Sequence, residues 1–176
     1  VELFAPLAAI THPASDWRYH GGAEAFFAGQ GLNYAEQPLP AGAYTWWTDF
    51  YLNGLPSPVF GPVAGITNGS AVIPTNAPNS TNVFYRLYLR VTETNGLSAI
   101  AARDIYPRLT QLDFQTVPGG LQVQFEGEPL TAPASVLTVA GMNRTLSAPS
   151  PQTLGGSNYS FVLWSHGGPA TQNFLV

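Results

Sequence analysis

The sequence contains no cysteine and no lysine, and it has few charged residues of either sign. Without cysteine, the chain can form neither disulfide bonds nor thiolate metal sites. All 6 basic residues are arginines, set against 10 acidic residues, for a net charge of -4. This balance lacks the basic stripe that binding to a phosphate backbone requires, so we expect no nucleic-acid partner.

Long apolar runs are also missing. No run approaches the ~18 apolar residues of a membrane-spanning helix, and we expect no membrane span. The chain starts at Val1, with neither a methionine nor a signal-like segment at its beginning. We therefore expect a mature or excised piece of a larger protein, with neighbouring domains as partners.

Charged residues make up only 9% of the chain, far below the roughly 25% of ordinary soluble domains. Hydrophobic residues still reach 45%, which argues against disorder, and 18 glycines and 16 prolines supply turns. This composition favours a loop-rich all-β protein. Chains of this kind, rich in Thr, Asn and Gly, are common among exported bacterial proteins, so we expect a secreted, extracellular location.

Residues 84–96 carry the clearest structural signal in the chain. Apolar residues alternate with polar and aromatic residues, including two arginines, which is the period-two pattern of a strand with one buried face. Asn95-Gly96 then predicts a tight turn into a second strand that ends near Tyr106. We expect a central hairpin of an antiparallel sheet, and its inner face would carry Tyr85, Leu87, Leu89 and Val91.

The densest aromatic stretch, residues 44–52, predicts another strand. Alternation puts Trp46 on one face and Trp47 and Asp49 on the other. Because an unpaired Asp49 would be costly to bury, the face with Trp46 is the better candidate for the core. The aromatic residues that we predict to lie in a core are Trp46, Phe50, Phe84 and Trp164.

Further short strands follow at intervals of about 8–12 residues, with no amphipathic helix between them. Residues 53–62 contain three prolines and are predicted as turns, whereas residues 158–164 are predicted as a strand. The whole pattern indicates an all-β chain with little or no helix. We predict two tandem β-sandwich domains, a larger one over residues 1–107 and a smaller one over residues 108–176.

Several segments resemble known families. Residues 85–96 follow the pattern Tyr-x-x-x-Leu-x-Val-Thr-(Asp/Glu)-x-x-Gly, and the first predicted domain thereby resembles the Ig-like domains of the polycystic-kidney-disease (PKD) type. Leu-Pro-Ala-x-x-x-x-Trp at 39–46, Gly-Ser-x-x-Ile-Pro at 69–74 and Arg-Asp-Ile-x-Pro-Arg at 103–108 are similar to the C-terminal region of secreted bacterial sugar dehydrogenases and other carbohydrate-active proteins.

The second predicted domain looks like the small β domain that often follows in those proteins. Val-Pro-x-Gly-Leu lies at 117–121, Gly-x-x-x-Thr-Leu-x-Ala-Pro at 141–149 and Tyr-x-Phe-x-x-Trp-Ser-x-Gly-Gly at 159–168. The acidic turn and His-rich run of those relatives are replaced here by NYAEQ at 33–37 and YLNGLPSP at 51–58, so no metal role is carried over. The resemblance implies a non-catalytic accessory domain for attachment or spacing, and it names no ligand.

Side chains for catalysis are sparse. His12, His20 and His166 are scattered through turn-rich segments, and Ser165 and His166 would point to opposite faces of a strand. No pair of carboxylates sits in a hydrolase motif. No loop carries more than one or two acids, so calcium would need backbone carbonyls as ligands. We predict no enzyme activity and no cofactor, with a structural calcium ion as an unsupported alternative.

Aromatic residues supply the candidate site. Trp47 and Tyr51 lie two residues apart on one face, about 6.8 Å along a strand. If strand 44–52 pairs with strand 84–94, an aromatic and arginine-bearing face results. Flat rings there could stack against sugar C–H faces, while Arg and Asp side chains bond hydroxyls. The predicted carbohydrate-binding residues are Trp47, Asp49, Tyr51, Arg86, Tyr88 and Arg90.

Two functions remain open from the sequence. The first is a polysaccharide-binding accessory module, with the aromatic face as its site. The second is a structural spacer, or a self-assembling subunit of an extracellular structure, in which a neighbour covers that face. Glycan binding that depends on Trp47 would favour the first, and self-association without glycan binding would favour the second.

Overall fold

The computed structural model describes residues 5–176 and confirms the all-β prediction. This part of the chain forms sixteen strands and one short 3-10 turn, η1 (Ala41–Ala43), with no α-helix. Two compact units are present. The first contains the described residues up to Tyr19, Ala23–Ile73 and Asn82–Arg108, and the second contains His20–Gly22, Pro74–Thr81 and Leu109–Val176. The predicted division into domains at residue 107 stays a prediction.

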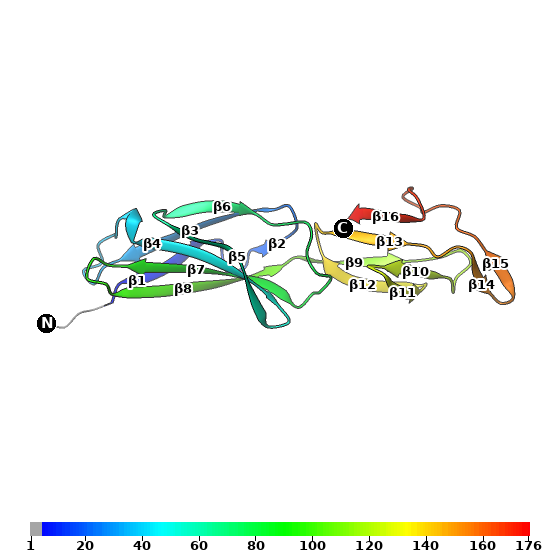
Figure 1. Cartoon of the computed structure of the whole chain (residues 1–176), viewed down its shortest axis with the longest axis horizontal. Helices are drawn as coiled ribbons and strands as arrows, with labels where there is room; N and C mark the ends of the chain where they lie inside the picture. Colours follow the sequence, from blue (N-terminus) through cyan, green and yellow to red (C-terminus); the bar gives the residue numbers. More distant parts are fainter. Residues whose placement is uncertain (1–4) are drawn as a thin grey trace. The chain divides into compact units, whose positions relative to one another are not determined.

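The first unit is built from two sheets. A five-stranded sheet has the order β2-β8-β7-β4-β5, and Figure 1 shows β4, β7 and β8 running side by side within it. A three-stranded sheet has the order β1-β3-β6. The bounds are β1 (Leu7–His12), β2 (Arg18–Tyr19), β3 (Glu24–Leu32), β4 (Tyr44–Leu52), β5 (Leu55–Ala64), β6 (Asn68–Val72), β7 (Val83–Thr92) and β8 (Ser98–Pro107).

The core of the first unit lies between these two sheets. The predicted inner face of β7 is confirmed, because Tyr85, Leu87, Leu89 and Val91 are all buried. Trp46 of β4 is fully buried among them, and its ring packs 5.0 Å from that of Phe27 in the three-stranded sheet. Apolar side chains from both sheets therefore fill one interior, as in a β-sandwich.

Two predictions in this unit are wrong. Residues 53–62 fall largely in strand β5, because β5 is an edge strand that pairs only with β4 and can tolerate prolines. Phe84 does not lie in the core. Strand alternation turns it away from Tyr85, and its half-buried ring stacks on Tyr51. Phe50 is half-buried beside Tyr85, with ring centroids 5.0 Å apart.

The second unit has a small core of its own. Phe114, Val123, Phe125 and Leu146 are buried together, and Trp164 packs against them while half-buried. The sheets are β11-β10-β13-β16, β12-β9 and β14-β15. The bounds are β9 (Leu109–Phe114), β10 (Gln122–Phe125), β11 (Glu128–Thr131), β12 (Ala134–Val139), β13 (Asn143–Ser147), β14 (Gln152–Leu154), β15 (Ser157–Tyr159) and β16 (Thr171–Leu175).

The strand predicted over residues 158–164 is wrong beyond Tyr159. β15 ends there, and residues 160–164 have no ladder partner. The local contacts of this segment come from side chains, since Ser150 Oγ accepts a hydrogen bond from the Phe161 N–H and the indole of Trp164 donates to the carbonyl of Pro169. The aromatic spacing predicts a strand, but no neighbouring strand pairs with this segment.

Candidate functional site

The predicted pairing of the two aromatic strands is confirmed. In the register of β4 and β7, Trp47 lies opposite Tyr88, and Asp49 lies opposite Arg86. These side chains share the face of the five-stranded sheet that points away from the core, here called the outer face. The outer face is formed by Trp47, Asp49 and Tyr51 of β4, by Phe84, Arg86, Tyr88 and Arg90 of β7, and by Ile100, Ala102, Asp104 and Tyr106 of β8.

The rings on the outer face stack in cross-strand pairs. The centroids of Trp47 and Tyr88 are 4.9 Å apart with planes 9° from parallel. Tyr51 and Phe84 stack at 4.6 Å and 10°. These spacings equal the separation of neighbouring strands, about 4.8 Å. The rings therefore stand upright on the sheet and cover one another's faces, rather than lying flat as an open platform.

Arg86 is held within the outer face. Its guanidinium group forms a two-pronged ion pair with Asp104, with Nη2 2.8 Å from Oδ2. The same group lies 4.9 Å from the ring centre of Tyr51 and 5.4 Å from that of Phe84. The hydrogen bond to Asp104 raises the pKa of Arg86, so the group stays charged. Its partner is Asp104 on β8, and Asp49 on the other side of β7 is left unpaired.

Two charged side chains on the outer face remain without a polar partner. Across residues 5–176, no hydrogen bond or ion pair involves the side chain of Asp49 or Arg90. Asp49 is half-buried, and Arg90 is exposed. They lie on either side of Trp47, one further along β4 and the other diagonally across on β7. A carboxylate acceptor and a guanidinium donor are therefore free beside one indole ring.

The side chains of Tyr51 and Tyr88 are hydrogen-bonded through their hydroxyl groups. Their hydroxyl oxygens are 3.2 Å apart. Burial raises the pKa of Tyr88, the bond to Tyr51 raises it further, and Arg86 opposes the rise. The two stacked pairs and Arg86 thus form one connected cluster, which fixes the orientation of Trp47.

The side of Trp47 that faces β5 is bordered by a glycine. On the β5 side, the ladder is interrupted opposite Trp47, and Gly61 approaches the backbone there. A Cβ atom at Gly61 would lie 2.5 Å from the carbonyl oxygen of Trp46 and 3.0 Å from the Cα atom of Trp47. Only glycine allows this approach, and Gly61 itself supplies no side chain to cover the indole.

The sequence prediction missed three contributors to the outer face. Phe84 is predicted in the core, and neither Asp104 nor Tyr106 is among the predicted binding residues. The guanidinium of Arg18 also reaches this face, 5.5 Å from the ring centre of Tyr106. The signal was available, because the Asn95-Gly96 turn sets the register of β8 and places Asp104 opposite Arg86.

A second polar cluster lies in the second unit. The Arg144 side chain is almost fully buried, and its Nη1 donates to the carbonyl of Ala77 at 2.6 Å. Nε is 3.3 Å from the Thr138 hydroxyl, and Nη1 is 3.7 Å from Glu126 Oε2. Burial lowers the pKa of Arg144, which Glu126 partly offsets. Since its contacts are internal, Arg144 acts as a structural anchor for the segment Pro74–Thr81.

The remaining titratable groups form no recognisable centre. Across the part of the chain that the structure describes, no three His, Asp or Glu side chains come close enough to hold a metal ion. His12 packs against Phe26, and His166 lies 2.8 Å from the amide of Gln172. Among residues 5–176, no helix combines the length and apolar character needed to cross a membrane. The chain matches no protein-family model, no curated protein and no solved structure.

Proposed function

We propose that the chain is a non-catalytic module that binds a polysaccharide through the outer face of its five-stranded sheet. The observation that carries the proposal is a stacked indole, Trp47, flanked by the unpaired charges of Asp49 and Arg90. Sugars combine apolar C–H faces with hydroxyl groups, and this trio offers a partner for each. Trp47 provides apolar contact, Asp49 accepts hydroxyl protons, and Arg90 donates to hydroxyl oxygens.

The spacing of these groups suits a sugar. Asp49 lies two residues from Trp47, about 6.8 Å along the strand, and Arg90 lies at the diagonal position, about 7–8 Å away. A ring placed against the exposed part of the indole is within reach of both. The other three residues of the predicted site have a different role in this proposal. Tyr51, Arg86 and Tyr88 support the indole, because their own faces and charges are already engaged.

The proposal also concerns the parent protein. We place the chain as an accessory part of a secreted bacterial protein, similar to the PKD-type domains of carbohydrate-active proteins. Support comes from the Tyr85–Gly96 pattern, which folds as β7 and the turn that follows it. The proposal needs no cofactor and no catalytic residue.

Affinity electrophoresis through gels with soluble polysaccharides, together with pull-down on insoluble ones, tests the proposal. We expect at least one glycan to retard the chain, and Trp47→Ala to weaken that binding by roughly tenfold or more. Trp17→Ala is the matched control, since Trp17 is also a half-buried indole of the first unit but lies outside the outer face. Equal retardation of both variants, or no retardation on any glycan, would contradict the proposal.

Self-assembly is the second candidate, and one observation favours it. Ile100 and Tyr106 on the outer face are 59% and 44% exposed. Exposed apolar residues beside stacked rings are typical of a face that a neighbour covers. Sedimentation velocity over a range of concentrations separates the two functions. Concentration-dependent association that Ile100→Asp abolishes, without glycan binding, would support assembly instead.

A further inference from the structure

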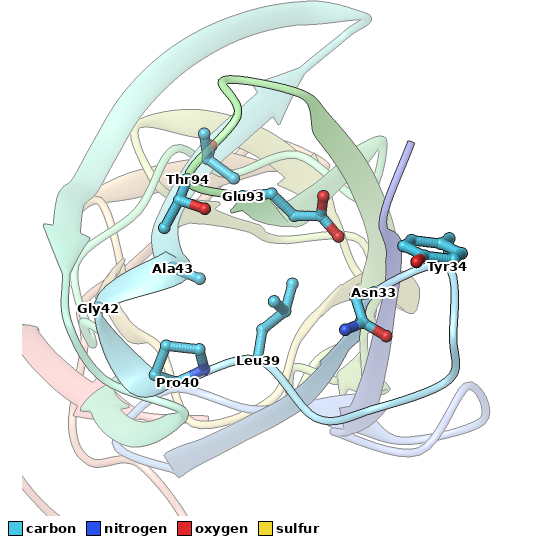
Figure 2. Close-up of a pocket in the computed structure, with 9 residues that line it drawn as sticks. Asn33, Tyr34, Leu39, Pro40, Gly42, Ala43, Glu93 and Thr94 are labelled. Atoms are coloured by element: carbon cyan, nitrogen blue, oxygen red, sulfur yellow. The ribbon is translucent and has the colours of Figure 1, made fainter. Parts of the chain in front are cut away.

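A pocket of about 340 Å³ opens at one end of the first unit. It lies where the connection from β3 to β4 meets the turn between β7 and β8 (Figure 2). Its walls are preformed, because the side-chain oxygen of Asn33 accepts hydrogen bonds from the backbone N–H groups of Ala35 and Gln37. The lining residues are Asn33, Tyr34, Leu39, Pro40, Gly42, Ala43, Thr92, Glu93 and Thr94.

Glu93 places a carboxylate in this pocket. It follows β7 directly, and its backbone N–H and carbonyl bond to Leu97 and Gly96, which fixes the turn. Oε2 accepts a hydrogen bond from the Asn95 amide at 2.9 Å. Oε1 is buried and has no hydrogen-bond partner among the described residues. Figure 2 shows the carboxylate group extending across the pocket toward the side of Asn33 and Tyr34.

No cation of the described chain neutralises Glu93. The chain lacks lysine, and the ion pairs present are those of Arg86 with Asp104 and Arg144 with Glu126. A buried polar atom without a partner costs about 1–3 kcal/mol, and more when it carries charge. A ligand that brings a positive N–H donor to this carboxylate would offset this cost. The pocket is therefore suited to a cation that is itself a hydrogen-bond donor.

The walls narrow the class of cation further. Leu39, Pro40 and Ala43 provide an apolar surface, and Figure 2 shows Leu39 extending into the pocket. Tyr34 stands to one side with 73% of its surface exposed, so its ring can face a bound cation. A divalent metal ion would need several oxygen ligands, and only one acidic residue lines the pocket. An ammonium group on an alkyl stem fits both the carboxylate and the apolar wall.

We propose that this pocket binds an alkylammonium group, from either a lysine side chain or a free polyamine. The ammonium donates to the carboxylate of Glu93, the methylene stem lies against Leu39 and Pro40, and the ring of Tyr34 contributes a cation–π contact. The site is independent of glycan binding, since no pocket residue belongs to the outer-face trio of Trp47, Asp49 and Arg90.

Amide chemical-shift titration of the full chain with n-butylammonium chloride tests the proposal. We expect saturable shifts at residues 33–43 and 93–96, and no matching shifts with n-butanol, which has the same stem without the charge. Glu93→Gln should weaken binding by roughly tenfold or more. Glu36→Gln is the matched control, because Glu36 is an exposed acid in the same connection that does not line the pocket. Tyr34→Leu should weaken binding by about threefold, a loss of ~0.6 kcal/mol.

Titration with Nα-acetyl-lysine methylamide and with putrescine then distinguishes a lysine side chain from a free polyamine as the ligand. Tighter binding of either compound supports an alkylammonium site. Three results would overturn the proposal: equal shifts with n-butanol, unchanged affinity in Glu93→Gln with its other amide signals intact, or no shift with any amine. A response to calcium chloride without a response to amines would also overturn it. None of these results bears on retention by glycans, so the two proposals fail separately.

Discussion

Trp46 and Trp47 are neighbours in β4, yet they lie in different environments on the two faces of the five-stranded sheet. Trp46 is fully buried, its indole N–H donates to the carbonyl of Ile66 at 2.9 Å, and its ring packs against Phe27 of the opposite sheet. Trp47 is half-buried and stacks on Tyr88 of its own sheet. One residue step along a strand thus separates a contact between sheets from a contact within one sheet.

The inner face depends on close approach. Gly29 and Gly31 of β3 leave room for Trp46, Leu89 and Val91, whose atoms would lie within 3 Å of an added Cβ atom. The outer face depends on cross-strand stacking and one ion pair, and its stacked rings are half-buried. We infer that the inner face stabilises the fold, while the outer face, which carries the proposed binding site, contributes less to stability. Each substitution below tests this assignment.

The largest expected effect is on the inner face. Trp46→Ala should lower the free energy of unfolding by about 3–5 kcal/mol, because it opens a cavity between the sheets. Trp47→Ala should cost only about 1 kcal/mol, the value of a cross-strand aromatic pair. Urea denaturation followed by circular dichroism measures both. Equal losses for the two variants would contradict the division between the faces.

Overpacking the inner face should have the next largest effect. A Cβ atom at Gly29 would lie 2.6 Å from Leu89 Cδ2 and 2.9 Å from the carbonyl oxygen of Ala9. Because the backbone cannot easily move, Gly29→Ala should lower the free energy of unfolding by about 1–3 kcal/mol. Gly42→Ala is the control, since nothing lies within 4 Å of its added Cβ atom. Equal urea midpoints for Gly29→Ala and Gly42→Ala would contradict the close packing of the inner face.

The outer-face ion pair should contribute less. The side chains of Arg86 and Asp104 are 33% and 28% exposed, so solvent screens them. Arg86→Met should cost about 1 kcal/mol or less in low salt. The difference from wild type should shrink in about 1 M NaCl, where the screening length is ~3 Å. A loss that is as large as that of Trp46→Ala, or insensitive to salt, would show that the outer face also supports the fold.

Strand alternation was readable from the sequence because it is local. The period-two pattern of residues 84–92 places Tyr85, Leu87 and Val91 on one face whatever the rest of the chain does, and the structure buries them. The same pattern turns Phe84 outward. The apolar character of Phe84 predicts a core position, but the strand period decides which face its side chain occupies.

The pairing of Arg86 was not readable from the sequence. In the sheet, Asp49 of β4 and Asp104 of β8 both lie directly opposite Arg86, one on each side. Register alone therefore leaves two carboxylates for one guanidinium group. The choice depends on the side-chain conformation of Arg86, which in the structure pairs with Asp104 and also lies over Tyr51. The Glu93 pocket was hidden for a similar reason, since it joins segments about fifty residues apart.

Substitution of the tyrosines of the two faces should have the smallest effect on stability at neutral pH. Its effect should become clear only in alkali. Burial and then the neighbouring Tyr85 raise the pKa of Tyr19, so it stays neutral in the fold when unfolded tyrosines ionise near pH ~10. A raised folded pKa contributes stability below about pH 10 that is lost as the pH rises further. Tyr19→Phe should therefore flatten the alkaline decline in the urea midpoint. Tyr88→Phe on the outer face should flatten it less, because Arg86 opposes the rise of the Tyr88 pKa. The reverse ranking would mean that the outer face shields its phenols from water better than the core does.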